Sequence, residues 1–213
     1  MDGLMQTDPT ETLKPWLTLW FQPRRTFLYL SGHYNEKWNL VWAALFGFGR
    51  ALDQAASSSQ GDVLPAELIF MIALISGPLG GIAVLYVVSV YFRWISGWFG
   101  GKASHEAVRS VFAWSLLPSA VTLACTVPFL IYFGQNWFIN PQPISTPLAW
   151  SLIMLLSGIG AIMTLLTLIL IVIGLAVVNQ FSIWKSLLSL LSGTAIIAVP
   201  IISLLLLTVY RGV

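Results

Sequence analysis

Residues 110–184 read SVFAWSLLPSAVTLACTVPFLIYFGQNWFINPQPISTPLAWSLIMLLSGIGAIMTLLTLILIVIGLAVVNQFSIW, and this stretch contains no charged side chain. A bilayer core of about 30 Å takes about 20 residues of helix, so the stretch is too long for one crossing. The segment 134–147 interrupts it with asparagine, glutamine and proline residues, which are typical of a loop. The stretch therefore predicts two membrane-spanning helices, over residues 110–133 and 148–178.

Two further uncharged stretches satisfy the same length criterion. One lies just before Arg93, and the other lies just after Lys185. Each is long enough for one helical crossing of the bilayer core. They predict membrane-spanning helices over residues 68–92 and 186–210.

The composition indicates that most of the chain lies in lipid. Hydrophobic residues make up 57% of the 213 residues and charged residues only 8%, whereas soluble domains carry about 25% charged residues. This balance excludes a soluble protein and a disordered one. A net charge of +2 also excludes a nucleic-acid-binding protein, because phosphate neutralisation needs several clustered cations. The composition predicts an integral membrane protein built from helices.

A fifth segment, residues 38–56, is only weakly apolar and contains Arg50 and Asp53. The distribution of cations decides whether it crosses, because cytoplasmic loops of membrane proteins hold the excess of Lys and Arg. The loop after the span 68–92 carries Lys102 and two arginines, so it belongs in the cytoplasm. The linker before that span then lies outside, and it carries no cation.

The segment ahead of these spans is also basic, with two lysines and two arginines, and therefore belongs in the cytoplasm. Both placements hold only if residues 38–56 cross the bilayer. The sequence thus predicts an all-α helical bundle with five spans, the N-terminus in the cytoplasm and the C-terminus outside. It divides the chain into a cytoplasmic segment, residues 1–37, and a five-span domain, residues 38–213.

Arg50 and Asp53 are spaced i, i+3 on the fifth predicted span, close enough to form an ion pair. A charge inside a span is costly and marks a candidate functional site. In the simpler interpretation, the pair lies in the outer third of the span and Arg50 extends outward to water. The alternative is a polar cavity between spans with the pair on its wall, as in a transporter or a lipid-handling protein.

The segment ahead of the spans is aromatic as well as basic. Residues 13–34 read LKPWLTLWFQPRRTFLYLSGHY, and each of the two prolines suits a first helical turn. The pattern predicts two short helices, or one bent helix, at the membrane interface, with rings among acyl chains and basic groups near anionic headgroups. The segment is either a membrane anchor or a docking surface for a cytoplasmic partner. Its candidate contact residues are Trp16, Trp20, Pro23, Arg24, Arg25 and Phe27.

Small residues recur four apart within the predicted spans, a spacing that lets two helix backbones approach closely in lipid. Two such pairs surround Pro78, and another lies in the last span. Prolines inside the spans are expected to bend their helices. The residues assigned to packing or bending are Ser76, Gly77, Pro78, Gly80, Gly81, Pro118, Ser189 and Gly193.

The side chains that most enzymes need are scarce. The chain has one cysteine and two histidines, which excludes cysteine-based zinc sites and leaves His105 without a visible partner. His105 shares the cationic loop with Gly100, Lys102 and Arg109, and this mixture of charges is typical of a solvated cytoplasmic face. The sequence therefore predicts a protein without catalytic residues, metal or cofactor.

Three local patterns, taken together, are typical of one family of membrane proteins. The first is Pro-Arg-Arg-Thr-Phe at residues 23–27, and the second is Gly-Gly-Lys at residues 100–102, followed by an aromatic residue four positions before Pro118. The third is the turn before the last span, residues 179–186, which reads NQFSIWKS. On these patterns and on the order of its spans and loops, the chain resembles the Yip family over residues 16–210.

The resemblance implies a five-span membrane protein that acts by binding, in membrane organisation or trafficking. Its partners would be membrane lipids, other membrane proteins or a second copy of the chain. Yip proteins were first known as interactors of Rab-type GTPases. Eukaryotic members, however, carry a Gly-Tyr pair where this chain has Ala113-Trp114, and an Asp-Leu-Tyr-Gly-Pro motif that this chain lacks. The chain therefore resembles the short prokaryotic branch, which implies the bacterial cytoplasmic membrane and no Rab partner.

Overall fold

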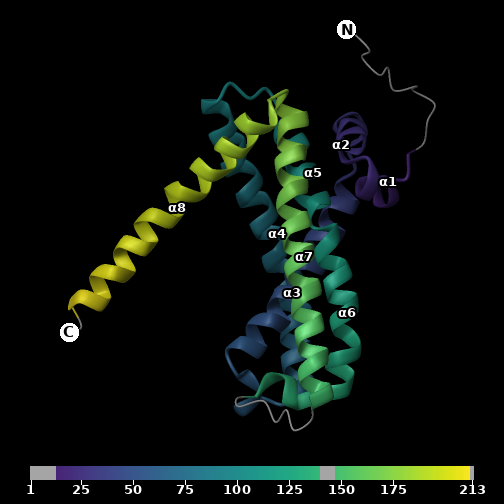
Figure 1. Ribbon diagram of the computed structural model, residues 1–213, viewed down its shortest axis with the longest axis vertical. Coiled ribbons are helices and arrows are strands. Elements are labelled where there is room, and N and C mark those ends of the chain that lie inside the picture. The colour runs from purple at the N-terminus through teal and green to yellow at the C-terminus, as the bar shows by residue number, and fades with distance from the viewer. Residues whose placement is uncertain (1–12, 140–146, 212–213) are drawn as a thin grey trace.

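The computed structural model describes residues 13–139 and 147–211, and within these ranges the protein is helical and has no strand (Figure 1). The predicted all-α bundle is confirmed. Four segments of the described chain are long and apolar enough to cross a membrane, judged by length and composition. They are α4 (Ala66–Trp98), the segment His105–Phe138, α7 (Pro147–Asn179) and the segment Ile183–Ser203 of α8 (Ile183–Arg211).

These helices are longer than the spans that the sequence predicts. The predicted span 68–92, for example, lies wholly inside α4, which continues through Arg93 to Trp98. Hydropathy detects only the apolar part of a helix. The helix itself continues into flanking residues that are polar, charged or aromatic. The predicted spans already exceed the roughly 20 residues that the bilayer core requires, so the extra turns extend the helices beyond that core.

The fifth predicted span coincides with helix α3 (Glu36–Ser57). Asn35 begins it, because its side-chain oxygen accepts a hydrogen bond from the backbone N–H of Lys37 at 3.1 Å. α3 is less apolar than the four segments above, since it carries four charged residues. Its 22 residues extend for about 33 Å at about 1.5 Å per residue. It runs antiparallel to α4 and packs along it.

The backbones of α3 and α4 are in direct contact. A Cβ atom added at Gly47 would lie 2.1 Å from the carbonyl oxygen of Gly77 and 2.8 Å from Cα of Gly81. No side chain fits at that separation, so glycine is required on both helices. Gly77 and Gly81 therefore face α3, whereas Ser76 and Gly80 lie on the exposed side of α4.

Two prolines in the spans have different effects. Pro78 stands inside α4, which continues past it. Pro118 lies in the first turn of α6 (Leu117–Phe133), directly after α5 (His105–Ser115) ends. Proline has no N–H to donate and clashes with the preceding turn, so a break at this point is expected. The predicted span 110–133 is therefore made of two helices in succession.

The turn after α4 explains the Gly-Gly-Lys pattern. Gly100 has a φ of +80°, a left-handed conformation that favours glycine. The N–H of Gly101 bonds to the carbonyl oxygen of Ser96 at 2.8 Å, which satisfies a carbonyl at the end of the helix. α4 therefore stops at a turn that its own sequence specifies.

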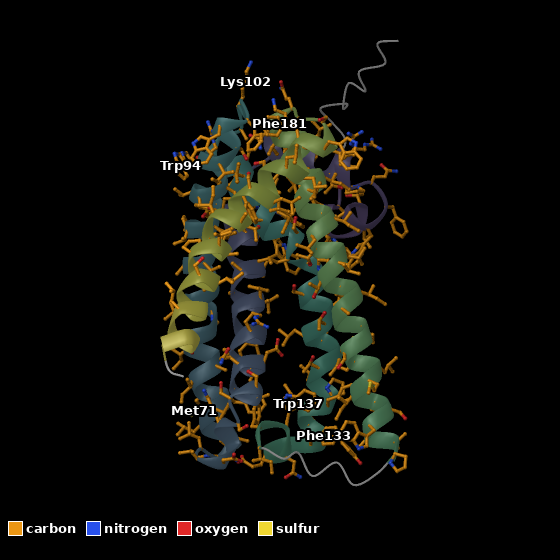
Figure 2. The ribbon with its side chains drawn as sticks, turned by 60° about the vertical axis from the view of Figure 1, so that its left-hand side comes forward. Met71, Trp94, Lys102, Phe133, Trp137 and Phe181 are labelled. Atoms are coloured by element: carbon orange, nitrogen blue, oxygen red, sulfur yellow. The ribbon has the colours of Figure 1, made fainter. Side chains whose placement is uncertain are left out.

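The side chain of Asn179 joins the ends of α4 and α7. It is 2% exposed, and its oxygen accepts a hydrogen bond from the backbone N–H of Ala103 at 3.4 Å. A Cβ atom at Gly101 would lie 2.4 Å from the same oxygen. The second glycine of the pattern thus makes room for Asn179. Lys102 and Phe181, which belong to these two turns, lie at the same end of the bundle (Figure 2).

The first turns of α8 pack against the C-terminal part of α4. Ser189 is 1% exposed, and its hydroxyl oxygen lies 3.5 Å from that of Ser96. A Cβ atom at Gly193 would lie 2.7 Å from the ring of Phe92, and the hydroxyl of Tyr91 donates to the Gly193 carbonyl oxygen at 2.7 Å. Beyond this contact, α8 diverges from the other helices (Figure 1).

Candidate functional site

Two short helices precede α3. They are α1 (Pro15–Phe21) and α2 (Pro23–Gly32), and each begins with its proline, the residue whose missing N–H is harmless in a first turn. The hydroxyl of Thr26 lies 2.9 Å from the hydroxyl of Thr18 and is hydrogen-bonded to it. This contact fixes the two helices relative to each other.

α2 is packed onto the membrane bundle. Phe27 is 1% exposed, and its ring would lie 3.2 Å from a Cβ atom added at Gly174 of α7. Val111 of α5 approaches the same position. The ring of Phe27 is therefore in contact with protein rather than with acyl chains. Arg24 is exposed, and Arg25 is partly buried.

A cavity of about 880 Å³ lies where α1 and α2 meet α3 and the α5–α6 junction. Small-molecule sites have volumes of about 300–1,000 Å³ and mostly apolar walls. This cavity has both properties, because aromatic and aliphatic side chains make up most of its lining. Its walls include Trp16, Trp20, Trp38, Trp42, Trp114 and Lys14.

Trp42 has the central position among these rings. Its ring centroid lies 6.1 Å from that of Trp38, one turn away on α3, and 5.7 Å from that of Trp114 on α5. The indole N–H of Trp42 is buried and has no hydrogen-bond partner. A buried N–H without a partner costs free energy.

The polar groups of the cavity favour an anion. The described residues that line it include Lys14 and His33 and no Asp or Glu. His33 is held in place because its ring stacks on that of Tyr29 at 4.2 Å between centroids. We call this cavity, with its tryptophan walls and its cationic edge, the aromatic cavity.

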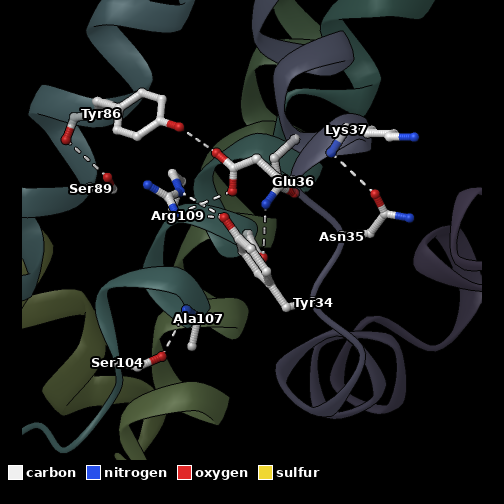
Figure 3. A network of polar contacts seen from close by, with 11 residues as sticks. Tyr34, Asn35, Glu36, Lys37, Tyr86, Ser89, Ser104, Ala107 and Arg109 are labelled. Atoms are coloured by element: carbon white, nitrogen blue, oxygen red, sulfur yellow. Dashed lines mark hydrogen bonds and ion pairs between the residues drawn. The ribbon is translucent and has the colours of Figure 1, made fainter.

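A polar network lies beside the aromatic cavity and is shown in Figure 3. The guanidinium of Arg109 lies 3.2 Å from the carboxylate of Glu36 and donates from Nε to the Tyr34 hydroxyl at 3.1 Å. It also lies 4.5 Å from the ring centroid of Tyr86, whose hydroxyl donates to Glu36. The network joins the start of α3 to α4 and α5. Arg109 thus lies within a helix and contacts three side chains.

The other residues of the predicted cationic loop remain in solvent. Lys102 is exposed between α4 and α5, and His105, the first residue of α5, is exposed as well. Ser104 starts the helix, because its hydroxyl accepts a hydrogen bond from the N–H of Ala107 at 3.1 Å. The structure does not bring Lys102 or His105 to the aromatic cavity.

Arg50 and Asp53 form an ion pair on α3 at 3.4 Å, with side chains 61% and 58% exposed. They line a smaller cleft, of about 200 Å³, between α3, α6 and α7. Hydroxyl groups complete its polar lining, among them those of Thr122 and Thr126. These two hydroxyls donate to backbone carbonyls of their own helix. The structure therefore contains both the ion pair and a partly polar cleft.

The family model of the Yip1 domain matches residues 17–207. The chain belongs to the Yip1 family. The match extends from α1 into α8, so the N-terminal helices and the apolar helices belong to one Yip1 domain. Membership in this membrane family, together with the apolar helices, shows that the chain is an integral membrane protein. No curated protein and no solved structure matched the chain.

Sequence reasoning finds only part of the aromatic cavity of this Yip1 protein. It singles out Trp16 and Trp20, but it does not assign Trp38, Trp42 or Trp114 to a site. The spacing of Trp38 and Trp42 was an available signal, because residues four apart share one face of a helix. Trp114 gives no such signal, since only the tertiary packing of α5 on α3 brings it to the cavity.

Proposed function

We propose that this Yip1-family protein is non-enzymatic and acts in membrane organisation or trafficking by binding lipids or other membrane proteins. The aromatic cavity carries the proposal. It is large, its walls are mostly apolar, and its described lining holds no serine, cysteine or carboxylate side chain. Such a site suits binding and does not bring together the nucleophile and base of a hydrolase.

The location that we propose is the cytoplasmic membrane of a bacterium, where no Rab-type GTPase is available as a partner. This rests on the resemblance to the short prokaryotic branch. Partners of this protein are then membrane lipids, other membrane proteins or a second copy of the chain.

We also propose that α3 crosses the membrane, which makes five spans with the N-terminus in the cytoplasm and the C-terminus outside. The close packing of α3 along α4 supports this, because a helix of about 33 Å alongside a spanning helix reaches across a core of about 30 Å. The charge distribution also supports it, since eight of the ten cations fall on the proposed cytoplasmic side. They are Lys14, Arg24, Arg25, Lys37, Arg93, Lys102, Arg109 and Lys185.

Cysteine labelling tests this topology, because the chain has a single native cysteine, Cys125. In a Cys125→Ser background, we expect a membrane-impermeant maleimide to label Val63→Cys in spheroplasts. Ser31→Cys and Lys102→Cys should react only after the membrane is opened. All three positions are exposed. Labelling of both Ser31→Cys and Val63→Cys in closed spheroplasts, with Lys102→Cys still protected, would mean that α3 does not cross. Labelling of Ser31→Cys and Lys102→Cys without Val63→Cys would mean that the orientation is reversed.

Arg24 and Arg25 offer a surface for a cytoplasmic partner at the edge of α2. Crosslinking in cells followed by purification tests it, with the wild type compared with Arg24→Ala/Arg25→Ala. We expect the double variant to lose at least one crosslinked protein that the wild type captures. Lys102→Ala, which removes an exposed cation elsewhere, should retain it. Identical sets of partners for all three proteins would remove this docking surface from the proposal.

The cleft beside Arg50 and Asp53 supports a second candidate function, that of a transporter or a lipid-handling protein. Its volume of about 200 Å³ has room for about six waters at about 30 Å³ each. The polar groups of its walls are largely paired within the protein, since Arg50 bonds Asp53 and the threonine hydroxyls bond backbone carbonyls. We therefore rank this function second. Lipid crosslinks at Thr122 or Thr126 would support it.

A further inference from the structure

We propose that the aromatic cavity binds one anionic glycerophospholipid from the surrounding membrane. One acyl chain lies among the tryptophan rings, and the phosphate lies at Lys14. This inference rests on the proposed function, which it makes specific by naming the ligand, its orientation and the residues that contact each part of it.

The walls of the cavity match an acyl chain. Trp16, Trp38, Trp42 and Trp114 line the cavity, and Val121 of α6 adds an aliphatic side chain. A cavity of about 880 Å³ falls in the upper part of the range that small-molecule sites occupy. Apolar atoms in a cavity of this size favour a long apolar ligand over a small polar one.

The edge of the cavity matches a phosphate. Lys14 and His33 line it, and the described lining contains no carboxylate that would repel an anion. A cation near the surface of an anionic membrane adds to lipid binding. The cation and the apolar wall thus match the two parts of an anionic phospholipid, its phosphate and its acyl chain.

The position of the cavity gives such a lipid a route of entry. Trp16 is 52% exposed, Trp38 is 50% exposed and Val121 is 36% exposed, so the cavity is not closed on their side. Trp38 lies near the N-terminal end of α3, and Val121 lies near the N-terminal end of α6. Both of these helix ends line the cavity beside α1 and α2. Tryptophan is enriched at this level of a membrane, between acyl chains and headgroups. A lipid would therefore enter sideways from the bilayer rather than from water.

Photo-crosslinking in nanodiscs tests the proposal. The discs contain phosphatidylcholine with a minor fraction of phosphatidylglycerol that carries a diazirine on its acyl chain, and mass spectrometry locates the crosslinks. We expect crosslinks on residues of α1, α3 and α6 that line the cavity. Val121→Trp fills the cavity and should lower the yield about tenfold, the effect of a loss of about 1.4 kcal/mol. Val127→Trp is the matched control, because Val127 is exposed on the same helix and does not line the cavity; its yield should stay at the wild-type level.

A charge variant tests the headgroup. Lys14→Gln should lower the yield with phosphatidylglycerol about fivefold, which is the effect of one cation near an anionic surface. A phosphatidylcholine probe with the same diazirine should be affected less. Lys102→Gln removes an exposed cation outside the cavity and should leave both yields unchanged. An excess of inorganic phosphate should not displace the lipid; displacement would assign the site to free phosphate and overturn the proposal.

Two further outcomes would overturn it. Equal yields for Val121→Trp and Val127→Trp, with both variants monodisperse, would mean that the lipid does not occupy the cavity. Crosslinks concentrated at Thr122 or Thr126 would place the lipid in the cleft of Arg50 and support the second candidate function. The two proposals can fail separately. If the lipid crosslinks do not depend on the cavity but Arg24→Ala/Arg25→Ala still loses a crosslinked protein, the lipid site is wrong and the proposed binding function stands.

Discussion

The variant Gly47→Ala is expected to lower the free energy of unfolding by about 3 kcal/mol, the upper part of the usual cost of overpacking. The added Cβ atom would lie 2.1 Å from the Gly77 carbonyl oxygen and 2.8 Å from Cα of Gly81. Both neighbours are backbone atoms of α4, so neither can rotate away. The two helices must separate, and the contacts along their length weaken together.

The measurement is unfolding of the purified protein in detergent, followed by tryptophan fluorescence. Gly49→Ala is the matched control on the same helix, because its Cβ atom would lie 3.6 Å from the side chain of Leu123, an ordinary contact. Alanine favours a helix more than glycine does, so Gly49→Ala should be as stable as the wild type or slightly more stable. Equal destabilisation by the two substitutions would contradict direct backbone contact at Gly47.

The second large effect is expected at Arg109. Arg109→Met keeps most of the side-chain volume but removes the ion pair with Glu36 and the contacts with Tyr34 and Tyr86. Leaving one charge of a buried pair alone costs about 3–5 kcal/mol. The side chains here are 17% and 33% exposed, and solvent screening lowers the cost. We therefore expect a loss of about 2 kcal/mol.

A double-mutant cycle distinguishes the ion pair from simple loss of packing. If the unpaired carboxylate is the main cost, Glu36→Gln/Arg109→Met should be more stable than Arg109→Met alone. Lys102→Met is the control, because Lys102 is an exposed cation in the loop before α5 and its removal should change the stability very little. Strict additivity of the two single substitutions would show that Arg109 and Glu36 do not interact.

The sequence predicts the apolar helices well, because the apolar stretch alone determines them. In the part of residues 110–184 that the structure describes, two long helical segments occupy the two predicted spans, and a short 3-10 helix, Gly134–Phe138, takes the start of the predicted loop. The break inside the first of these segments was less visible. Proline predicts a kink, but hydropathy does not show that α5 is buried on nearly all sides while α6 has an exposed face.

The small residues of α4 show which part of the packing a pattern can predict. The spacing indicated two pairs, yet Gly77 and Gly81 face α3, and Ser76 and Gly80 face outward. A four-residue spacing fixes which residues share a face but does not say which face meets a neighbour. Gly47, the partner on α3, could not be chosen from the sequence because the register of two helices is a tertiary property.

The candidate site shows the same limit. Tyr34, Glu36, Tyr86 and Arg109 form one network (Figure 3), although they come from three separate parts of the chain. The sequence placed Arg109 in a solvated loop, because charged residues near a span end are usually solvated. The ion pair with Glu36 and the contacts with the two tyrosines offset the cost of burying Arg109. These partners cannot be identified from the sequence, because only the packing of α5 against α3 and α4 brings them to Arg109.

The hydrogen bond from Ala103 to Asn179 couples two parts of the protein mechanically. The loop that carries Lys102 cannot move away from the end of α7 unless this bond breaks. α8 begins four residues beyond Asn179, so the loop and the start of α8 are both attached to the end of α7. A displacement of the loop that keeps this bond would therefore displace the start of α8, the helix that diverges from the others (Figure 1).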